Sequence, residues 1–167
     1  MAAAVTIRPE ADADVEAVVD VLAAVAAEGR WIGTEFPFDT AARAVAIRRS
    51  LADGDAAGFV ADVDGRIIGS IGLDLEPYGV VEFGMCLLDG YRGRGIGRRL
   101  LEAGIEWARD AGAHKVALQV WPHNDTAIAL YRKMGFLEEG RLRRHYRRRN
   151  GEQWDAVLMG LLLEERP

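Results

Sequence analysis

The stretch that most constrains the fold is YRGRGIG, residues 91–97, in which three glycines alternate with other residues, two of them arginines. The apolar run 80–88 precedes it, and Ile96, Leu100 and Ile105 mark a helical face after it. Taken alone, such a run is typical of a solvated surface turn. The first N–H groups of a helix are unpaired, however, and glycine lets a phosphate approach them. This position therefore predicts a strand, a phosphate-binding loop and a helix in succession.

Two familiar phosphate loops do not fit this stretch. A mononucleotide P-loop needs a lysine followed by serine or threonine, and neither lysine of the chain has that neighbour. A dinucleotide loop needs Gly-x-Gly-x-x-Gly and an acid about 20 residues further on. Here the spacing is Gly-x-Gly-x-Gly, and the next apolar run, residues 115–121, ends without an acid. Another kind of phosphate-bearing ligand is indicated.

The remaining hydrophobic spacing predicts an α/β fold with a mixed, largely antiparallel sheet. Strands are expected at 5–9, on both sides of an Asp64-Gly65 turn within 57–75, at 80–88 and 115–121, from 136 onward and after an Asn150-Gly151 turn; helices are expected within 11–29, 40–51, 96–111 and 124–135. This order, β-α-α-β-β-β-α-β-α-β-β, gives about seven strands with four helices. Because no linker or repeat interrupts it, residues 1–167 are expected to form a single domain.

Charge and hydropathy exclude several classes of protein. The net charge is −5, although residues 141–149 (RLRRHYRRR) hold six arginines and no acid. The rest has 15 basic and 26 acidic residues, so a general nucleic-acid-binding surface is not expected. No apolar run approaches the ~20 residues that cross a bilayer, and MAAAVTIRPE does not have the pattern of a signal peptide. A cytoplasmic protein without membrane association is expected.

Cysteine and histidine usage argues against redox and metal chemistry. Cys86, the single cysteine, lies in the apolar run 80–88 and is expected to be a buried, inert thiol. His114, His123 and His145 do not have the spacing of metal ligands, so no metal is expected.

Two motifs point to a family. Arg92-x-x-Gly95-x-Gly97 resembles the Arg/Gln-x-x-Gly-x-Gly/Ala signature of the GNAT superfamily, the N-acetyltransferases that depend on acetyl-coenzyme A (acetyl-CoA). Residues 124–136, NDTAIALYRKMGF, are similar to the family's Asn-x6-Tyr segment ending in Gly-Phe, and the order of elements matches along nearly the whole chain. The resemblance implies the GNAT fold, acetyl-CoA as acetyl donor and a primary amine as acceptor, with direct attack in a ternary complex.

The resemblance also implies a cofactor site. Its members are expected to be Leu87, Leu88, Asp89, Arg92, Gly93, Arg94, Gly95, Ile96, Gly97, Asn124 and Tyr131. The loop would bind the pyrophosphate, and the backbone N–H of Leu87 or Leu88 would stabilise the oxyanion. Asn124 would cap its helix or bind the pantetheine arm. Tyr131 follows Asn124 by about two helical turns and is the expected general acid, although a core tyrosine has the same spacing.

Acetyl transfer also needs a neutral amine. A lysine amine has a pKa of ~10.4 and an α-amino group one near ~8, so a base or a water path for the proton is expected. Glu82, an acid within the apolar run 80–88, is the candidate base, unless strand alternation simply points it to solvent. Relatives that acetylate protein N-termini often carry a glutamate where this chain has Gln119, which argues against their base assignment and their ribosomal-protein substrates.

The resemblance places the acceptor between residues 30–39 and the hairpin that contains the arginine run 141–149. Trp31 and Phe36 would wall the pocket and Glu35 would attract an ammonium group, or these residues form a small core or a dimer contact. The arginine run would bind an acceptor carboxylate, the 3′-phosphate or a partner subunit, or it is a solvated edge. A small amine such as an amino acid is favoured.

Other functions stay open at this point. The alternatives are a protein or peptide amine as acceptor, a non-catalytic acyl-CoA sensor, and an RNA-binding domain that uses the arginine hairpin. The sequence does not decide the oligomeric state, although a homodimer is common for domains of this type.

Overall fold

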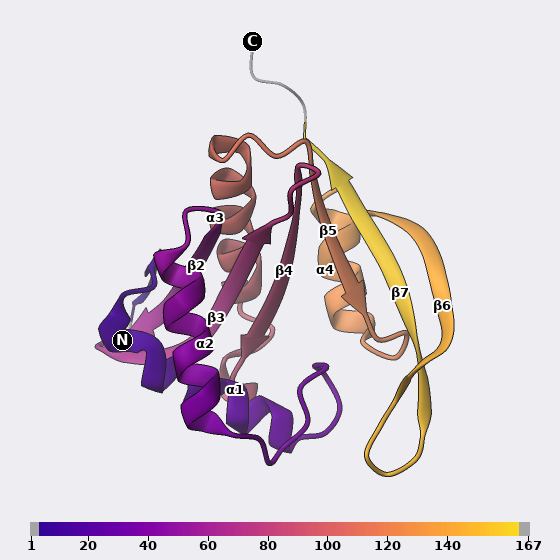
Figure 1. The fold of residues 1–167 in the computed structure, drawn as a ribbon, viewed down its shortest axis with the longest axis horizontal. Helices are drawn as coiled ribbons and strands as arrows, with labels where there is room; N and C mark the ends of the chain where they lie inside the picture. Colours follow the sequence, from indigo (N-terminus) through magenta and orange to yellow (C-terminus); the bar gives the residue numbers. More distant parts are fainter. Residues whose placement is uncertain (1–3, 164–167) are drawn as a thin grey trace.

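Seven strands form one mixed sheet in the computed structural model, which describes residues 4–163. The strands are β1 (Val5–Pro9), β2 (Ala56–Val63), β3 (Arg66–Leu75), β4 (Val80–Leu87), β5 (Lys115–Val120), β6 (Leu137–Arg147) and β7 (Gln153–Leu162), in the spatial order β1-β2-β3-β4-β5-β7-β6. The helices are α1 (Val15–Ala27), α2 (Thr40–Ala52), α3 (Ile96–Asp110) and α4 (Asp125–Lys133). Helices α1 and α2 cover one face of the sheet, and α3 and α4 cover the other (Figure 1).

The predicted fold class, element order and mixed sheet are confirmed. Local signals explain why the element boundaries agree with the sequence. Asp64 and Gly65 both have positive φ angles, of 51° and 84°, as a two-residue hairpin turn requires. The Asp39 carboxylate accepts a hydrogen bond from the N–H of Ala42 at 2.8 Å and caps α2. Two short 3-10 segments, η1 (Asp12–Asp14) and η2 (Asp89–Tyr91), were not expected.

The feature of the sheet that positions the site is the separation of β4 from β5. These strands are the parallel pair, and their pairing ends where Glu82 lies opposite Ala117. Beyond that point β4 continues to Leu87 beside β3 alone, and β5 continues beside β7 alone. A wedge therefore opens between two neighbouring strands in the middle of the sheet.

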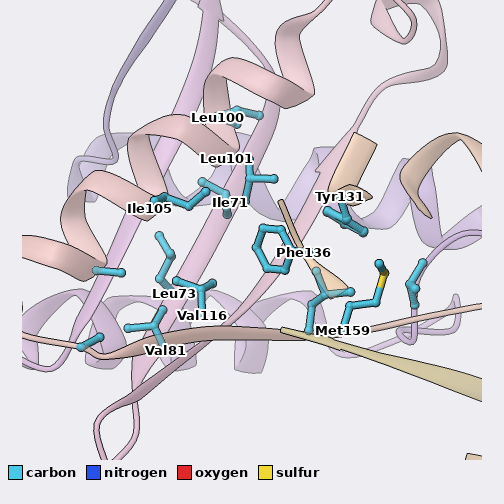
Figure 2. Close-up of a cluster of buried hydrophobic side chains, with 14 of the residues drawn as sticks. Ile71, Leu73, Val81, Leu100, Leu101, Ile105, Val116, Tyr131, Phe136 and Met159 are labelled. Atoms are coloured by element: carbon cyan, nitrogen blue, oxygen red, sulfur yellow. The ribbon is translucent and has the colours of Figure 1, made fainter. Parts of the chain in front are cut away.

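Alternation along β4 sends its side chains to different layers. Phe83 and Met85 pack into the main core under α3 and α4, whereas Cys86 packs with α1 on the other face. Figure 2 shows part of the main core, in which Phe136 packs against Tyr131 at a centroid distance of 5.8 Å. The β4 side of the wedge therefore carries side chains that point to both faces of the sheet.

Cys86 is buried, as predicted, and burial raises the pKa of its thiol to about 11. In the described part of the chain no helix has the length and apolar character needed to span a membrane. Within the same residues, no group of three or more histidine, cysteine, aspartate or glutamate side chains is arranged to hold a metal ion.

Candidate active site

A cleft of about 1400 Å³ occupies the wedge between β4 and β5. Its walls come from both strands, from the loop that begins α3, from α4 and from the segment around Trp31. Most small-molecule pockets measure roughly 300–1,000 Å³, so this cleft has room for a larger ligand or for two ligands at once.

The glycine loop forms an open cradle at one end of the cleft. Gly93 and Gly95 have φ angles of +72° and +77°, a conformation that glycine adopts without strain, and no atom lies within 4 Å of where a Cβ would stand on either residue. Gly95 is the residue before α3, and no side chain caps the N-terminus of this helix. The cradle therefore offers unpaired N–H groups and the positive end of the helix dipole to an anion.

The two arginines of the loop have different surroundings. The Arg92 guanidinium is half-buried and already bonded to the protein: it donates to the Glu28 carboxylate at 2.7 and 2.8 Å and to the Leu87 carbonyl at 2.9 Å. The Arg94 guanidinium lies over the ring of Tyr91, with its carbon 5.8 Å from the ring centroid. Arg92 lines the cleft and Arg94 does not, so direct phosphate contacts by these two arginines stay predictions.

Tyr131 lies on α4. Its ring packs against other aromatic rings of the core, and the residue also lines the cleft. The ring makes edge-on contacts with Phe83 and a tilted one with Phe136, at centroid distances of 5.9 and 5.8 Å. Within residues 4–163 its hydroxyl makes no hydrogen bond. Burial raises the pKa of Tyr131 to about 12, so the hydroxyl keeps its proton at neutral pH. The sequence left open whether Tyr131 is a core residue or the general acid. The two roles are compatible, because a buried tyrosine can line the cleft and keep its proton.

The end of β4 supplies one free backbone donor to the wedge. The N–H of Leu88 donates to the carbonyl of Ile68 at 3.0 Å and is therefore already satisfied. In an antiparallel pair, successive residues point their N–H groups to opposite sides of the strand. The N–H of Leu87 accordingly points away from β3, toward the side from which β5 has separated. Leu87 is the remaining candidate for stabilising an oxyanion.

Two polar side chains lie on the α1 and α2 face of the wedge. Glu82 is exposed, lines the cleft and occupies the last position at which β4 and β5 pair. Gln119 accepts a hydrogen bond from the Tyr146 hydroxyl at 2.5 Å and lines the same cleft. Glu82 is therefore solvated and faces the cleft, which suits a base that acts through water.

Asn124 joins α4 to the cleft. Its side-chain oxygen accepts a hydrogen bond from the N–H of Ala127 at 3.2 Å, which confirms the predicted helix cap. Asn124 also lines the cleft, where a pantetheine arm could reach it. The contact with that arm stays a prediction. The neighbouring His123 binds the Arg30 carbonyl through Nε2 at 2.7 Å, in keeping with a structural histidine.

The three residues predicted to bind the acceptor are not brought together. Trp31 lines the cleft. Glu35 accepts a hydrogen bond from the N–H of Arg149 at 3.1 Å and lies 3.5 Å from the Arg148 guanidinium, so its charge is already compensated. Phe36 is 52% exposed and contacts Phe38 at a centroid distance of 6.5 Å. Their binding roles stay predictions, and Trp31 has the most direct structural support.

Sequence reasoning missed Arg148. The sequence does not distinguish Arg148 from the other arginines of the run, yet its side chain is only 5% exposed and packs against two indole rings that also contact each other. Its guanidinium carbon is 4.5 Å from the Trp154 centroid and 5.4 Å from that of Trp121, and it donates to the Gly33 carbonyl at 3.0 Å. Arg148 therefore ties the end of β6 to the loop between α1 and α2, which lies at the same end of the sheet (Figure 1).

Replacing Arg148 by alanine is expected to lower the free energy of unfolding by about 2–4 kcal/mol, because two desolvated cation–π contacts and a charged hydrogen bond are lost. Arg147→Ala is the matched control, since Arg147 is exposed, and a change within about 0.5 kcal/mol is expected there. Chemical denaturation followed by circular dichroism measures both. Equal transition midpoints for the two variants would show that the contacts of Arg148 with the two indoles do not stabilise the fold.

Solved structures with this fold identify its class. The protein yncA from Salmonella typhimurium, solved with its cofactor acetyl-CoA, superimposes with a TM-score of 0.87 over 98% of this chain and 96% of its own, at 22% identity. The fold is that of the GNAT acetyltransferases. A model of the acetyltransferase (GNAT) family also matches residues 23–136, more than half of the chain. The chain therefore belongs to the GNAT family.

Two curated relatives show the range of substrates within the family. The N-alpha-acetyltransferase RimI of Mycobacterium tuberculosis is 51% identical over 57 residues, which are 34% of each chain. The L-amino acid N-acetyltransferase AaaT of Escherichia coli is 33% identical over 109 residues, 60% of this chain and 65% of its own. Both matches span less than two thirds of the relative's length.

Proposed function

We propose that this protein is an N-acetyltransferase that transfers the acetyl group of acetyl-CoA to the primary amine of a small molecule, such as an amino acid. The observation that carries the proposal is the continuity of one cleft. Its lining runs from the Gly93 and Gly95 cradle to Tyr131 on one side of the wedge and Glu82 on the other. Family membership and the amino acid specificity of the Escherichia coli relative support it.

The residues present suit acetyl-CoA as the donor. Gly93, Gly95 and the uncapped N-terminus of α3 would hold the pyrophosphate, with Arg94 as a further cation. The edges of β4 and β5 that separation leaves free would hold the pantetheine arm, as a peptide-like chain added to a strand. Acetyl-CoA supplies the thioester, whose acetyl group is the one transferred.

The chain's own residues would then move two protons and stabilise one charge. Glu82 takes up, through water, the proton that the amine loses as its nitrogen forms a bond with the acetyl carbon. The N–H of Leu87 donates to the carbonyl oxygen while that oxygen carries negative charge. Tyr131, kept protonated by burial, donates its proton to the sulfur as the bond between carbon and sulfur breaks.

A protein N-terminus is the second candidate acceptor. The 51% identity to the Mycobacterium tuberculosis N-alpha-acetyltransferase favours it. Two features favour the small molecule instead: Gln119 stands where an N-terminal acetyltransferase often has its base, and Arg148 holds the β6–β7 hairpin against the α1–α2 loop. Closure of the hairpin onto the loop restricts the space available to a long peptide.

A panel of amines tests the proposal. Release of free thiol from acetyl-CoA is followed with single amino acids, short aliphatic and aromatic amines, and peptides with alanine or serine at the N-terminus. We expect amine-dependent release with at least one free amine, at a higher kcat/KM than with any peptide. A preference for peptides would favour the second candidate. Binding of acetyl-CoA with no release from any amine would favour an acyl-CoA sensor.

A further inference from the structure

The carboxylate of Glu28, one residue beyond the end of α1, joins two walls of the cleft. It accepts two hydrogen bonds from the Arg92 guanidinium, at 2.7 and 2.8 Å, and one from the Trp31 indole N–H at 2.7 Å. Glu28 itself does not line the cleft, whereas both of its partners do. Any role of Glu28 must therefore act through Arg92 and Trp31.

The Arg92 guanidinium extends this connection to the cradle. Besides Glu28, it donates to the carbonyl of Leu87 at 2.9 Å, and its own backbone N–H donates to the Asp89 carbonyl at 3.1 Å. The next residue in the chain is Gly93, the first glycine of the cradle. The position of the cradle and the end of β4 are thus both fixed by a side chain that Glu28 holds.

This arrangement differs from an ordinary surface ion pair, which contributes little because both side chains stay solvated and mobile. The Glu28 and Arg92 side chains are only 32% and 27% exposed, and the pairing is bidentate. The hydrogen bonds from Arg92 lower the pKa of Glu28, so the carboxylate is charged throughout the neutral range. Moving either partner therefore breaks several directional contacts at once.

We propose that Glu28 is a positioning residue that couples the two ligands of the cleft: through Arg92 it sets the anion cradle, and through Trp31 it sets the acceptor wall. The inference rests on the proposed function, because it assigns Trp31 to the acceptor. Because Arg92 and Trp31 share the Glu28 carboxylate, a shift of Arg92 on anion binding at the cradle is passed on to Trp31, so donor binding changes the acceptor wall. Coupling between two ligands is reciprocal, so acceptor binding strengthens cofactor binding by the same factor.

The first test needs no acceptor and uses coenzyme A as the probe. The fluorescence of Trp31 is taken, for each protein, as the difference between that protein and the same protein carrying Trp31→Phe. It is measured with and without saturating coenzyme A. We expect this difference signal to change on binding in the wild type and to stay constant in Glu28→Gln. Arg92→Gln, which removes the other partner, is expected to behave like Glu28→Gln. The same change in all three proteins would overturn the proposal.

The second test is kinetic and uses the best acceptor of the amine panel. Glu28→Gln is expected to raise the KM of the acceptor about tenfold, the size of an ordinary coupling, with kcat within about twofold of wild type. Glu16→Gln is the matched control, because Glu16 lies on α1 and accepts a hydrogen bond from Arg48 of α2 at 2.6 Å, but does not line the cleft. No change is expected there. A fall in kcat at constant KM would contradict a positioning role.

The two tests separate the inference from the proposed function. Failure of every amine in the panel would refute the proposed function, while the fluorescence signal would still decide whether Glu28 links the cradle to Trp31. Equal unfolding temperatures of wild type and Glu28→Gln, measured alongside, show that a lost signal is not caused by loss of the fold.

Discussion

Replacing Gly95 by aspartate is expected to weaken acetyl-CoA binding by about 100-fold or more, or about 2.8 kcal/mol. The space beyond the Gly95 Cα is open, and this is where the cradle would receive a phosphate. A carboxylate there fills the cradle and repels the ligand at the N-terminus of α3. Aspartate tolerates positive φ better than most residues, so the variant is expected to fold. Isothermal titration with acetyl-CoA measures the loss.

Gly112→Asp is the matched control for this variant. Gly112 has a φ of +79° and open space around it, like Gly95, but it follows α3 and does not line the cleft. Its backbone strain is therefore similar and its distance from the ligand differs. Acetyl-CoA affinity within about twofold of wild type is expected for a surface change of this kind. Unchanged affinity in Gly95→Asp would place the phosphate somewhere other than the cradle.

Tyr131→Phe is expected to lower kcat by about 100-fold, at the lower end of what a well-placed acid contributes. Phenylalanine keeps the ring contacts with Phe83 and Phe136, so acetyl-CoA affinity is expected to stay within about twofold of wild type. Steady-state kinetics with the best amine, together with titration of acetyl-CoA, separates the two effects. Tyr78→Phe is the control, because Tyr78 is exposed and does not line the cleft.

The pH dependence adds a second check on Tyr131. Since burial raises the pKa of its hydroxyl to about 12, the acid form persists well above the pH at which an exposed tyrosine ionises. The kcat of the wild type is therefore expected to follow the same pH dependence as the kcat of Tyr131→Phe up to about pH 11. A fall in kcat caused by ionisation of Tyr131 is expected only above that pH. Equal kcat in the two proteins would mean that the thiolate leaves unaided or takes its proton from water.

The elements of the fold were predictable because their signals are local. The Asp64-Gly65 turn, the Asn124 cap and the glycine loop before α3 each depend on a few consecutive residues, and each is confirmed. The motif in residues 91–97 also predicted which strand and helix meet at the cradle. The apolar character of residues 80–88 further predicted that Cys86 would be buried.

The shape of the site depends on contacts between distant residues, which no local pattern contains. The wedge exists because β4 and β5 pair over only three positions. Arg92 binds Glu28, which is 64 positions away in the sequence, and Arg148 binds Gly33, which is 115 positions away. An arginine run reads as uniformly charged, although β6 and the turn after it bury one arginine and expose its neighbours. The homodimer and the cytoplasmic location stay predictions.

The most direct test of the central claim is identification of the product. The purified protein is incubated with acetyl-CoA and the best amine of the panel, and both the free thiol and the N-acetylated amine are quantified by mass spectrometry. We predict equal amounts of the two products with the wild type and a loss of both with Gly95→Asp. Thiol that appears without acetylated amine, or acetylated amine formed equally well by Gly95→Asp, would contradict the assignment of this cleft as the acetyl-transfer site.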